Sequence, residues 1–460
     1  MSRPESEAEY LARMVPPSVA GLSGLSRRSL FKTALGAAAV FGLPSVLAGC
    51  GGDSGGGGEG GAGGDSGGGG SVGGTITWGT NESGTTFAKQ YEAQAADFAK
   101  KNAGTEVKIN AADHDTFQTN INNYLQGNPD DVFTWFAGYR MKFFAARGLI
   151  GDVSDIWPLD GIAESFKTAS TGDDGKQYFA PVSYYPWAIF YRKSVWEQKG
   201  YEVPKTLDEL EALAKQMQDD KLIPFAFADK EGWPAMGTFD ALNMRINGYQ
   251  YHVDLMAGNK AWDSPETKKV FDTWRMLLPY HQPDALGRTW QEAAQSLQQK
   301  KSGMFLLGTF MNEQFPEAER EDLDFFTFPE VDPAIGADAL DAPIDGSCMS
   351  ANPKNEEGAK AFLKYLASPD SLAAAVASTK LPFISANANA DESAYTSLQK
   401  KSAELVSQQK NIAQFLDRDT RPDFASTVVI PAFQTFLKNP DDIDGLTKSL
   451  EEQKKSIFAG

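Results

Sequence analysis

Five aromatic residues stand at predicted strand ends, at predicted helix starts or in an aromatic junction, where a side chain can face a ligand instead of the core. They are Tyr185, Trp187, Trp233, Trp290 and Phe310. Flat apolar faces of this kind pack against the C–H face of a sugar ring. Core packing is the competing explanation, since tryptophan is highly buried on average. We predict that these five side chains line one groove.

Polar and charged side chains follow the first three predicted strands. Ligands gather at the carboxyl ends of strands in open α/β sheets, which nominates a second set of binding residues. The set is Asn81, Glu82, Asp113, His114, Phe136, Tyr139 and Arg140. Arg421, in a charged run at residues 417–421 that is predicted to be a loop, is a further candidate. Carboxylates, amides and arginine can bind sugar hydroxyls, whereas a solvated charge or a helix cap is the competing role for the charged members.

Strands and helices alternate along the first part of the chain, which is typical of an open α/β architecture with a mostly parallel sheet. The predicted strands and the helices between them cover residues 75–78, 87–98, 106–109, 116–125 and 132–135. A second set begins with the pattern TLDE at residues 206–209, which predicts a helix start before a strand at residues 223–228.

Residues 176–193 (KQYFAPVSYYPWAIFYRK) contain two β-rich runs that meet at Tyr184, Tyr185 and Pro186. The junction is too aromatic for an ordinary solvent loop. Pro181 and Pro186 remove two backbone donors, so this backbone suits a crossing between two bodies better than the middle of a sheet. A core hairpin whose aromatic residues only fill space is the alternative.

The order of three motifs resembles a known family. An aromatic-Ala-Pro strand at residues 179–181 is followed by aromatic-Arg-Lys at 191–193 and by PKTLDEL at 204–210. This order is similar to that of the extracellular solute-binding proteins of family 1, the carbohydrate-binding lipoproteins of ABC importers that include the maltose-binding protein. The resemblance covers residues 75–458. It implies a periplasmic-binding-protein-like fold of class α/β, in which two lobes with mostly parallel sheets are joined by a multi-strand hinge.

The resemblance also divides the chain into lobes. Lobe I would comprise residues 75–183 and 345–383, and lobe II would comprise residues 184–344 and 384–460. The run at residues 341–347 resembles the second crossing between lobes, which adds Asp345 and Gly346 to the candidate binding residues. Residues 381–383 would form the third crossing.

Two positions depart from the maltose-binding pattern. In relatives, the segment that matches residues 127–150 carries a stacking aromatic residue and a polar ligand to sugar hydroxyls, and Phe136 and Tyr139 fall at those places. Tyr139 stands where relatives often have an aspartate. Phe310 replaces the usual tryptophan of a Gly-x-Trp strand ending. Maltose itself is therefore not implied.

The N-terminus has the pattern of an export signal. The run SRRSLFK at residues 26–32 precedes an apolar segment at 33–47 that is too short for a comfortable membrane span. The paired arginines resemble a twin-arginine signal, and the general secretory path is the alternative. Residues 1–49 are therefore predicted to be a signal peptide.

A lipid anchor and a tether are predicted next. The sequence LAGC at residues 47–50 resembles the lipobox of bacterial lipoproteins, which would make Cys50 the lipidated residue. The glycine-rich segment that completes residues 50–74 would be a flexible coil with a root-mean-square span of roughly 25–30 Å. We expect an extracytoplasmic protein that is anchored to the outer face of the cell membrane.

Composition excludes several functions. The formal net charge is −18 at pH 7, which argues against nucleic acid and favours a neutral or cationic ligand. Besides Cys50 only Cys348 is present, so no disulfide framework is expected and Cys348 is predicted to be a buried small hydrophobe. The histidines are scattered, and no phosphate-binding glycine loop or hydrolase motif occurs. No cofactor and no metal are therefore expected.

Together the patterns predict a monomeric binding protein without catalytic residues. It would capture a neutral mono- or oligosaccharide between its lobes and deliver it to ABC permease subunits in the membrane, with a cytoplasmic ATPase as an indirect partner. A secreted, tethered glycoside-active enzyme is the alternative, because the many acids could include a catalytic carboxylate pair. A binder of amino sugars or polyols is a third possibility.

Overall fold

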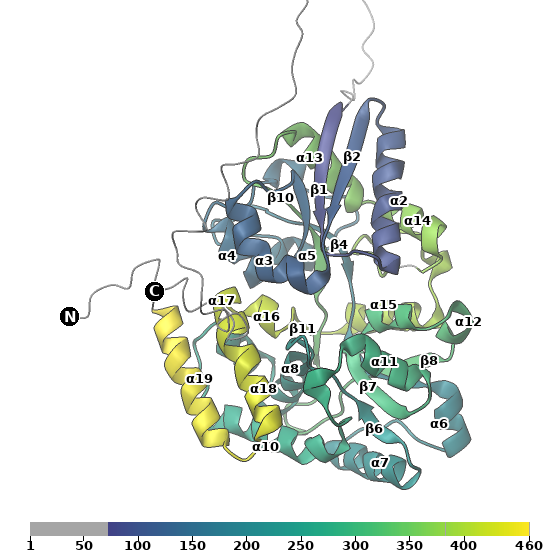
Figure 1. The fold of residues 1–460 in the computed structure, drawn as a ribbon, viewed down its shortest axis with the longest axis vertical. Helices are drawn as coiled ribbons and strands as arrows, with labels where there is room; N and C mark the ends of the chain where they lie inside the picture. Colours follow the sequence, from purple (N-terminus) through teal and green to yellow (C-terminus); the bar gives the residue numbers. More distant parts are fainter. Residues whose placement is uncertain (1–71, 382, 460) are drawn as a thin grey trace, which may run out of the picture. The chain divides into compact units, whose positions relative to one another are not determined.

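The computed structural model describes residues 72–381 and 383–459. The predicted signal peptide, Cys50 and most of the predicted tether lie outside these residues. Two β-sheets flanked by helices account for most of the described chain (Figure 1). The predicted class, α/β, is confirmed, although both sheets are mixed where mostly parallel sheets were expected.

The first sheet has the strand order β2-β1-β3-β10-β4. Its strands are β1 (Gly74–Thr80), β2 (Thr105–Ala111), β3 (Val132–Phe136), β4 (Ala180–Tyr184) and β10 (Ile344–Met349). β1 pairs in parallel with both of its neighbours, whereas β10 runs antiparallel to β3 and β4. β10 enters this sheet on the chain's return from the second sheet, so no local β-α-β unit fixes its direction. Cys348 on β10 is fully buried, as predicted.

Helices cover both faces of the first sheet. They are α2 (Thr86–Lys101), α3 (His114–Gln126), α4 (Tyr139–Ala145), α5 (Glu164–Ala169), α13 (Glu356–Leu366) and α14 (Pro369–Thr379). On one face Trp78 of β1 packs against Phe362 of α13, with 5.0 Å between ring centroids. On the other face Trp135 of β3 packs against Phe144 of α4 at 5.6 Å. α14 lies against α2 (Figure 1).

The second sheet has the strand order β6-β7-β5-β8. Its strands are β5 (Trp187–Arg192), β6 (Ile223–Ala226), β7 (Ser302–Gly308) and β8 (Leu323–Phe326). β6 and β7 are parallel, whereas β5 runs antiparallel to β7 and β8. A separate parallel pair joins β9 (Ala339–Asp341) to β11 (Asn411–Ala413).

A larger set of helices accompanies the second sheet. They are α6 (Lys193–Lys199), α7 (Leu207–Asp219), α8 (Pro234–Asn247), α9 (Tyr249–Met256), α10 (Pro265–Leu277), α11 (Trp290–Gln298), α12 (Glu317–Arg320), α15 (Ser397–Gln408), α16 (Leu416–Asp419), α17 (Pro422–Phe424), α18 (Ile430–Lys438) and α19 (Ile443–Phe458). Phe239 of α8, Phe271 of α10 and Phe433 of α18 meet in the core, with ring centroids 5.1–5.7 Å apart. Burial of large aromatic rings on this scale is a main source of stability for this part of the chain.

Helix caps follow the sequence patterns. Thr289 and Glu292 form a complete capping box at the start of α11. Thr206 caps α7 by accepting a hydrogen bond from the Glu209 N–H, but the Glu209 carboxylate binds the Lys205 N–H instead of that of Thr206. These caps fix where α7 and α11 begin, and α11 begins with a predicted site residue.

The chain passes between the two sheets at short proline-containing links. β4 ends at Tyr184 in the first sheet, and β5 begins at Trp187 in the second. The return link joins β9 to β10 through Ala342 and Pro343. A third link comes later in the chain. The backbone at residues 384–386 still pairs with β4, and the chain reaches α15, which packs against β8, only afterwards.

Candidate functional site

A cavity of about 390 Å³ is lined by residues that follow strands of both sheets. This volume falls within the range of about 300–1,000 Å³ that is usual for small-molecule sites. Most of the predicted binding residues line it: Asn81, Glu82, Asp113, His114, Phe136, Tyr185, Trp187, Trp233, Trp290, Phe310, Asp345 and Gly346. The remaining three, Tyr139, Arg140 and Arg421, are not among its described lining residues.

One side of the cavity is an aromatic wall, made of Tyr185, Trp187, Trp233, Trp290 and Phe310. The Phe310 ring is central, with its centroid 5.2 Å from that of Tyr185 and 5.1 Å from that of Trp290. Its centroid is also 6.1 Å from that of Trp233 and 6.3 Å from that of Trp187. Trp187 is buried, whereas the other four rings are partly exposed. Trp187 therefore supports the wall from behind, and the other rings keep surface for a ligand.

Two glycines allow the aromatic wall to pack this closely. A Cβ at Gly237 of α8 would overlap the Trp187 indole. A Cβ at Gly308, the last residue of β7, would overlap the ring of Phe310 and lie 2.8 Å from the ring of Tyr185. The missing side chains leave the space that the rings fill, so these glycines serve close packing and not a special backbone angle.

The opposite side is a polar wall, made of Asn81, Glu82, Asp113, His114 and Asp345 from the first sheet and its loops. The Thr134 hydroxyl donates a hydrogen bond of 2.9 Å to Asn81 Oδ1. This bond turns the Asn81 amide nitrogen toward His114 Nδ1, 3.1 Å away. Burial, with the nearby guanidinium of Arg418, lowers the pKa of His114 to about 4. His114 is therefore neutral near pH 7.

Asp113 serves mainly as a helix cap. It is exposed, and its carboxylate accepts a 3.0 Å hydrogen bond from the Thr116 N–H at the start of α3. This is the competing role that the sequence left open. Its position at the cavity edge still adds negative charge to the polar wall.

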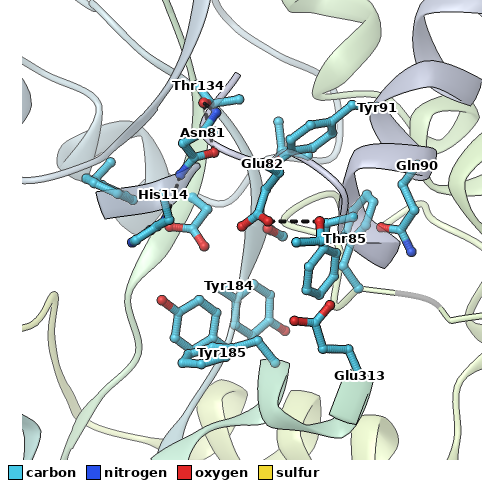
Figure 2. A pocket seen from close by; sticks show the side chains of 18 of the residues that line it. Asn81, Glu82, Thr85, Gln90, Tyr91, His114, Thr134, Tyr184, Tyr185 and Glu313 are labelled. Carbon is cyan, nitrogen blue, oxygen red and sulfur yellow. Dashed lines mark hydrogen bonds between the residues drawn. The ribbon is translucent and has the colours of Figure 1, made fainter. Parts of the chain in front are cut away.

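Two carboxylates face the cavity from opposite sides. Figure 2 shows Glu82 entering from the first sheet, with its hydrogen bond from Thr85, and Glu313 entering from the other side. Glu313 belongs to the 3₁₀ helix η5 (Thr309–Gln314), which follows β7. Burial raises the pKa of each carboxyl group to about 7. The mutual repulsion of Glu82 and Glu313 adds to the shift of Glu82.

Arg418 spans the two walls. It comes from α16, beside the second sheet, and its guanidinium donates a 2.8 Å hydrogen bond to Asp345 Oδ1 of β10. The guanidinium also donates to the Tyr185 hydroxyl at 3.1 Å and lies 4.0 Å from the centre of the Phe136 ring. The charged bond partly offsets the burial that raises the pKa of Asp345. Arg418 thus holds a carboxylate, a phenol and an aromatic face at one point of the cavity.

The three predicted residues outside the lining have other contacts. Arg140 of α4 donates hydrogen bonds to Gln118 and to Asp417 of α16, so it supports lining residues from behind. Arg421 is paired with Asp423 at 2.8 Å. Tyr139 is half-buried at the start of α4.

Several lining residues were not predicted. They include Asp115, Gln118, Asn312, Glu313, Asp417 and Arg418. Arg418 lies in the same charged run as Arg421, but the run forms the short helix α16 and not the expected loop. The helical turn decides which arginine faces the cavity. Glu313 lies one helical turn after Phe310, a spacing that could have nominated it.

Comparison with known proteins identifies the family. The model of the bacterial extracellular solute-binding proteins matches residues 81–373, which is more than half of the chain, and the chain belongs to this family. An uncharacterized ABC transporter extracellular-binding protein of Pyrococcus horikoshii is 25% identical over 60% of this chain. The alpha-glucosides-binding periplasmic protein AglE of Rhizobium meliloti is 25% identical over 58%. The chain spans less than two thirds of the length of the curated relatives it matches, with 64% and 63% for these two.

Solved structures show the same fold. The bacterial solute receptor AcbH, described as having an exclusive substrate preference for b-D-galactopyranose, is 42% identical. Its TM-score is 0.81, and the match covers 84% of this chain and 99% of that chain. A chitin oligosaccharide binding protein shares the fold at 19% identity, with a TM-score of 0.74 over 83% of this chain and 98% of that chain. Across residues 72–381 and 383–459, no helix has both the length and the apolar character needed to cross a bilayer.

Proposed function

We propose that this protein is the substrate-binding component of an ABC importer and binds a neutral sugar in the cavity. The aromatic wall would stack against the C–H face of one sugar ring, while Arg418 and the polar wall bind its hydroxyls. The observation that carries the proposal is the meeting of these two walls in a single cavity of small-molecule size. The permease would receive the sugar after binding.

The ligand proposed is a galactopyranose, as the free sugar or at the end of a short saccharide. The support is the 42% identity to AcbH over nearly the whole of that receptor. Galactose and glucose differ only in the orientation of one hydroxyl, so selection requires a hydrogen-bonding partner that reaches one epimer alone. The partly buried carboxylates Glu82, Glu313 and Asp345 line the cavity and would supply it.

A thermal-shift and calorimetry panel tests the function. The full chain is purified in detergent and titrated with galactose, glucose, galactosamine, galactitol, lactose, raffinose and maltose. Galactose at 100 times its Kd should stabilise the protein by about 2.7 kcal/mol. Glucose should bind at least about tenfold more weakly, which corresponds to about 1.4 kcal/mol. A panel without any binding sugar, or with galactosamine or galactitol bound more tightly than galactose, would overturn the assignment.

Binding without turnover distinguishes this function from the glycoside-active alternative. Lactose or raffinose incubated with the protein should release no galactose above the uncatalysed rate, whereas an enzyme would turn over at about 1–1,000 per second. The support for binding alone is the family and its similarity to other binding proteins. Hydrolysis that disappears in Glu313→Gln would favour the enzyme.

The membrane anchor is proposed to be a lipid on Cys50, after export through the twin-arginine path. Diacyl modification supplies far more membrane binding than the uncharged tether could. Cys50→Ser should shift the protein from the membrane fraction to the soluble fraction while the melting temperature of the folded domain stays unchanged. Retention of the variant in washed membranes would exclude the anchor.

The two sheets are proposed to be the centres of two lobes that close on the sugar. Lobe I would comprise residues 75–183 and 345–390, and lobe II residues 184–344 and 391–460. The later boundary rests on the pairing of residues 384–386 with β4. The protein is proposed to act as a monomer.

A further inference from the structure

A second group of chemically active side chains lies away from the cavity, beside the β9–β11 pair. Asp240 of α8, His252 of α9 and Asp341 at the end of β9 each offer one ligand atom, and these atoms lie within 4.8 Å of one another. Asp240 and His252 are fully buried, and Asp341 is 2% exposed. Three separate elements therefore bring two carboxylates and an imidazole together inside the protein.

Three of the four carboxylate oxygens of this group lack a hydrogen-bond partner among the described residues. Among the described residues, neither oxygen of Asp341 has a hydrogen-bond partner, and Asp240 Oδ1 has none. Unpaired carboxylate oxygens in the interior cost several kcal/mol unless a positive charge or donors satisfy them. The unpaired oxygens therefore require a proton, a further donor or a cation, which the described side chains do not supply.

The positive charge of Arg245 does not meet that need. Arg245 of α8 lowers the electrostatic cost of Asp341, but its donors bind backbone carbonyls. Its Nε donates to the Phe328 carbonyl at 2.8 Å, and its Nη1 donates to the Ala339 carbonyl at 2.6 Å. Arg245 thus contributes a positive charge near Asp341, while these two hydrogen bonds go to backbone carbonyls and not to the carboxylates.

The spacing of the ligand atoms suits a metal ion. His252 Nδ1 and Asp240 Oδ1 are 3.9 Å apart, which is too long for a direct hydrogen bond. Metal–ligand bonds of about 2.0–2.2 Å place two ligand atoms up to about 4 Å apart across one ion. The Asn243 amide nitrogen lies 3.1 Å from His252 Nδ1, and its own amide oxygen accepts from Asn247. Nδ1 therefore carries a lone pair and no proton, and a cation bound there would replace the Asn243 N–H as the partner of that lone pair.

We propose that Asp240, His252 and Asp341 bind a divalent cation of the Zn²⁺ or Mn²⁺ kind. Two carboxylates and one imidazole suit these borderline and hard ions, whereas an imidazole ligand disfavours Ca²⁺ and Mg²⁺. The ion neutralises the two buried carboxylates and links α8, α9 and β9. Because the site is enclosed, it is loaded during folding.

The cation also positions a residue of the sugar site, an effect that rests on the proposed function. The Leu416 N–H at the start of α16 donates a 2.7 Å hydrogen bond to Asp240 Oδ2. Arg418, two residues further along α16, reaches Asp345 in the cavity. Asp240 thus connects the cation to the helix that carries Arg418. Loss of the ion would loosen α16 and weaken sugar binding without removing a sugar contact.

Metal content after refolding tests the site. The full chain is unfolded in guanidinium with a chelator and refolded in detergent with ZnSO₄, MnCl₂, CaCl₂, MgCl₂ or chelator alone, then desalted and examined by elemental mass spectrometry and melting. We expect about one Zn²⁺ or Mn²⁺ per chain and a higher melting temperature than in the chelator-treated sample. Equal melting in all samples without bound metal would overturn the site, since a buried water or a shared proton would then satisfy the carboxylates.

Variants separate this site from chance binding. Asp341→Asn keeps the shape and should reduce bound metal to about a tenth or less. Asp229→Asn is the matched control, because Asp229 is also fully buried with one unpartnered oxygen among the described residues but lies outside the group. It should keep the metal. Zinc retained by Asp341→Asn would be adventitious and would overturn the proposal. If Asp341→Asn fails to fold, the comparison of the refolded wild-type samples still shows whether the group binds a metal.

Sugar affinity gives an independent measurement. The galactose Kd of the metal-loaded protein should be about tenfold lower than that of the metal-free protein. If the protein binds the metal but does not bind galactose, the metal site is supported and galactose is rejected as the ligand. Galactose binding that is equal with and without metal would overturn the link through α16.

Discussion

The aromatic wall and the polar wall of the cavity are built in different ways. The rings of the aromatic wall pack on one another and on the large core beside the second sheet, with Phe310 touching the other four. The polar wall has no such shared core, and its side chains are held one by one through hydrogen bonds such as Thr134 to Asn81 and Thr85 to Glu82.

The difference shows how each wall can serve recognition. A packed aromatic surface fixes the plane of a sugar ring but distinguishes epimers poorly, because stacking depends little on the direction of one hydroxyl. Individually held carboxylates and amides distinguish epimers well, since each accepts or donates in one direction. The aromatic wall should therefore supply affinity and the polar wall selectivity.

The largest effect is expected where the walls meet. Arg418→Met keeps most of the apolar stem and removes the charge, which leaves the half-buried Asp345 without its partner. The guanidinium would also donate charged hydrogen bonds to the sugar hydroxyls, and each such bond contributes about 1.5–3 kcal/mol, so the loss of two should lower galactose affinity more than about 100-fold. Calorimetry measures the Kd, and the melting temperature shows whether the variant is still folded. Arg421→Met is the control from the same run of sequence, and it should change the Kd less than about threefold. If both variants lose the same galactose affinity, Arg418 is not a specific contact of the sugar site.

Removal of one ring tests the aromatic wall. Trp233→Ala should cost about 1–3 kcal/mol of ligand binding, or roughly 5- to 150-fold in Kd, with galactose and its epimers affected alike. The control is Trp274→Ala, because Trp274 is fully buried in the core beside the second sheet. That substitution should lower the free energy of unfolding by about 3–5 kcal/mol and leave the Kd of the folded protein nearly unchanged. If Trp233→Ala has a much lower melting temperature but an unchanged galactose Kd, Trp233 is a core residue and not a ligand contact.

Stability measured as a function of pH tests Glu82 of the polar wall. Burial raises the pKa of Glu82 to about 7 in the folded protein, above its ordinary value of 4.5. The folded protein therefore holds a proton that the unfolded chain releases between these values, and stability falls as the pH rises from about 4.5 to 7. Glu82→Gln cannot ionise, so it should lose less stability over this window, and the difference should appear as a few degrees in melting temperature.

The comparison for this series is Glu92→Gln, on the exposed side of α2. Its melting temperature should follow that of the wild type at every pH. If Glu82→Gln also follows the wild type, Glu82 is not held as a buried acid. Galactose titrations at pH 5.5 and 8 would then show no dependence on this residue.

From the sequence, position along an element was sufficient to nominate some of the residues that line the cavity. Trp233, Trp290 and Phe310 were found because strand ends and helix starts are recognisable from local patterns, and the structure brings their rings together. Arg418 was missed because α16 is a single turn, and the side of that turn that faces the cavity depends on Leu416 binding Asp240, 176 positions away. The proposed third crossing lies later than the expected residues 381–383 for a similar reason. Residues 384–386 extend the first sheet through pairing with β4, which has no local signal.

The smallest effect is expected at Tyr139, which the resemblance to the maltose-binding proteins placed among the candidate binding residues. The structure places it half-buried at the start of α4, outside the described lining residues, while the next residue, Arg140, reaches Asp417. Tyr139→Phe removes only the phenol oxygen, so the galactose Kd should change less than about threefold, or about 0.6 kcal/mol. Arg140→Met gives the contrast, because it leaves Asp417 without its cation and should weaken binding more. A loss above tenfold in Tyr139→Phe would mean that α4 moves toward the sugar when the cavity closes, and the polar wall would then include the position that the aspartate occupies in relatives.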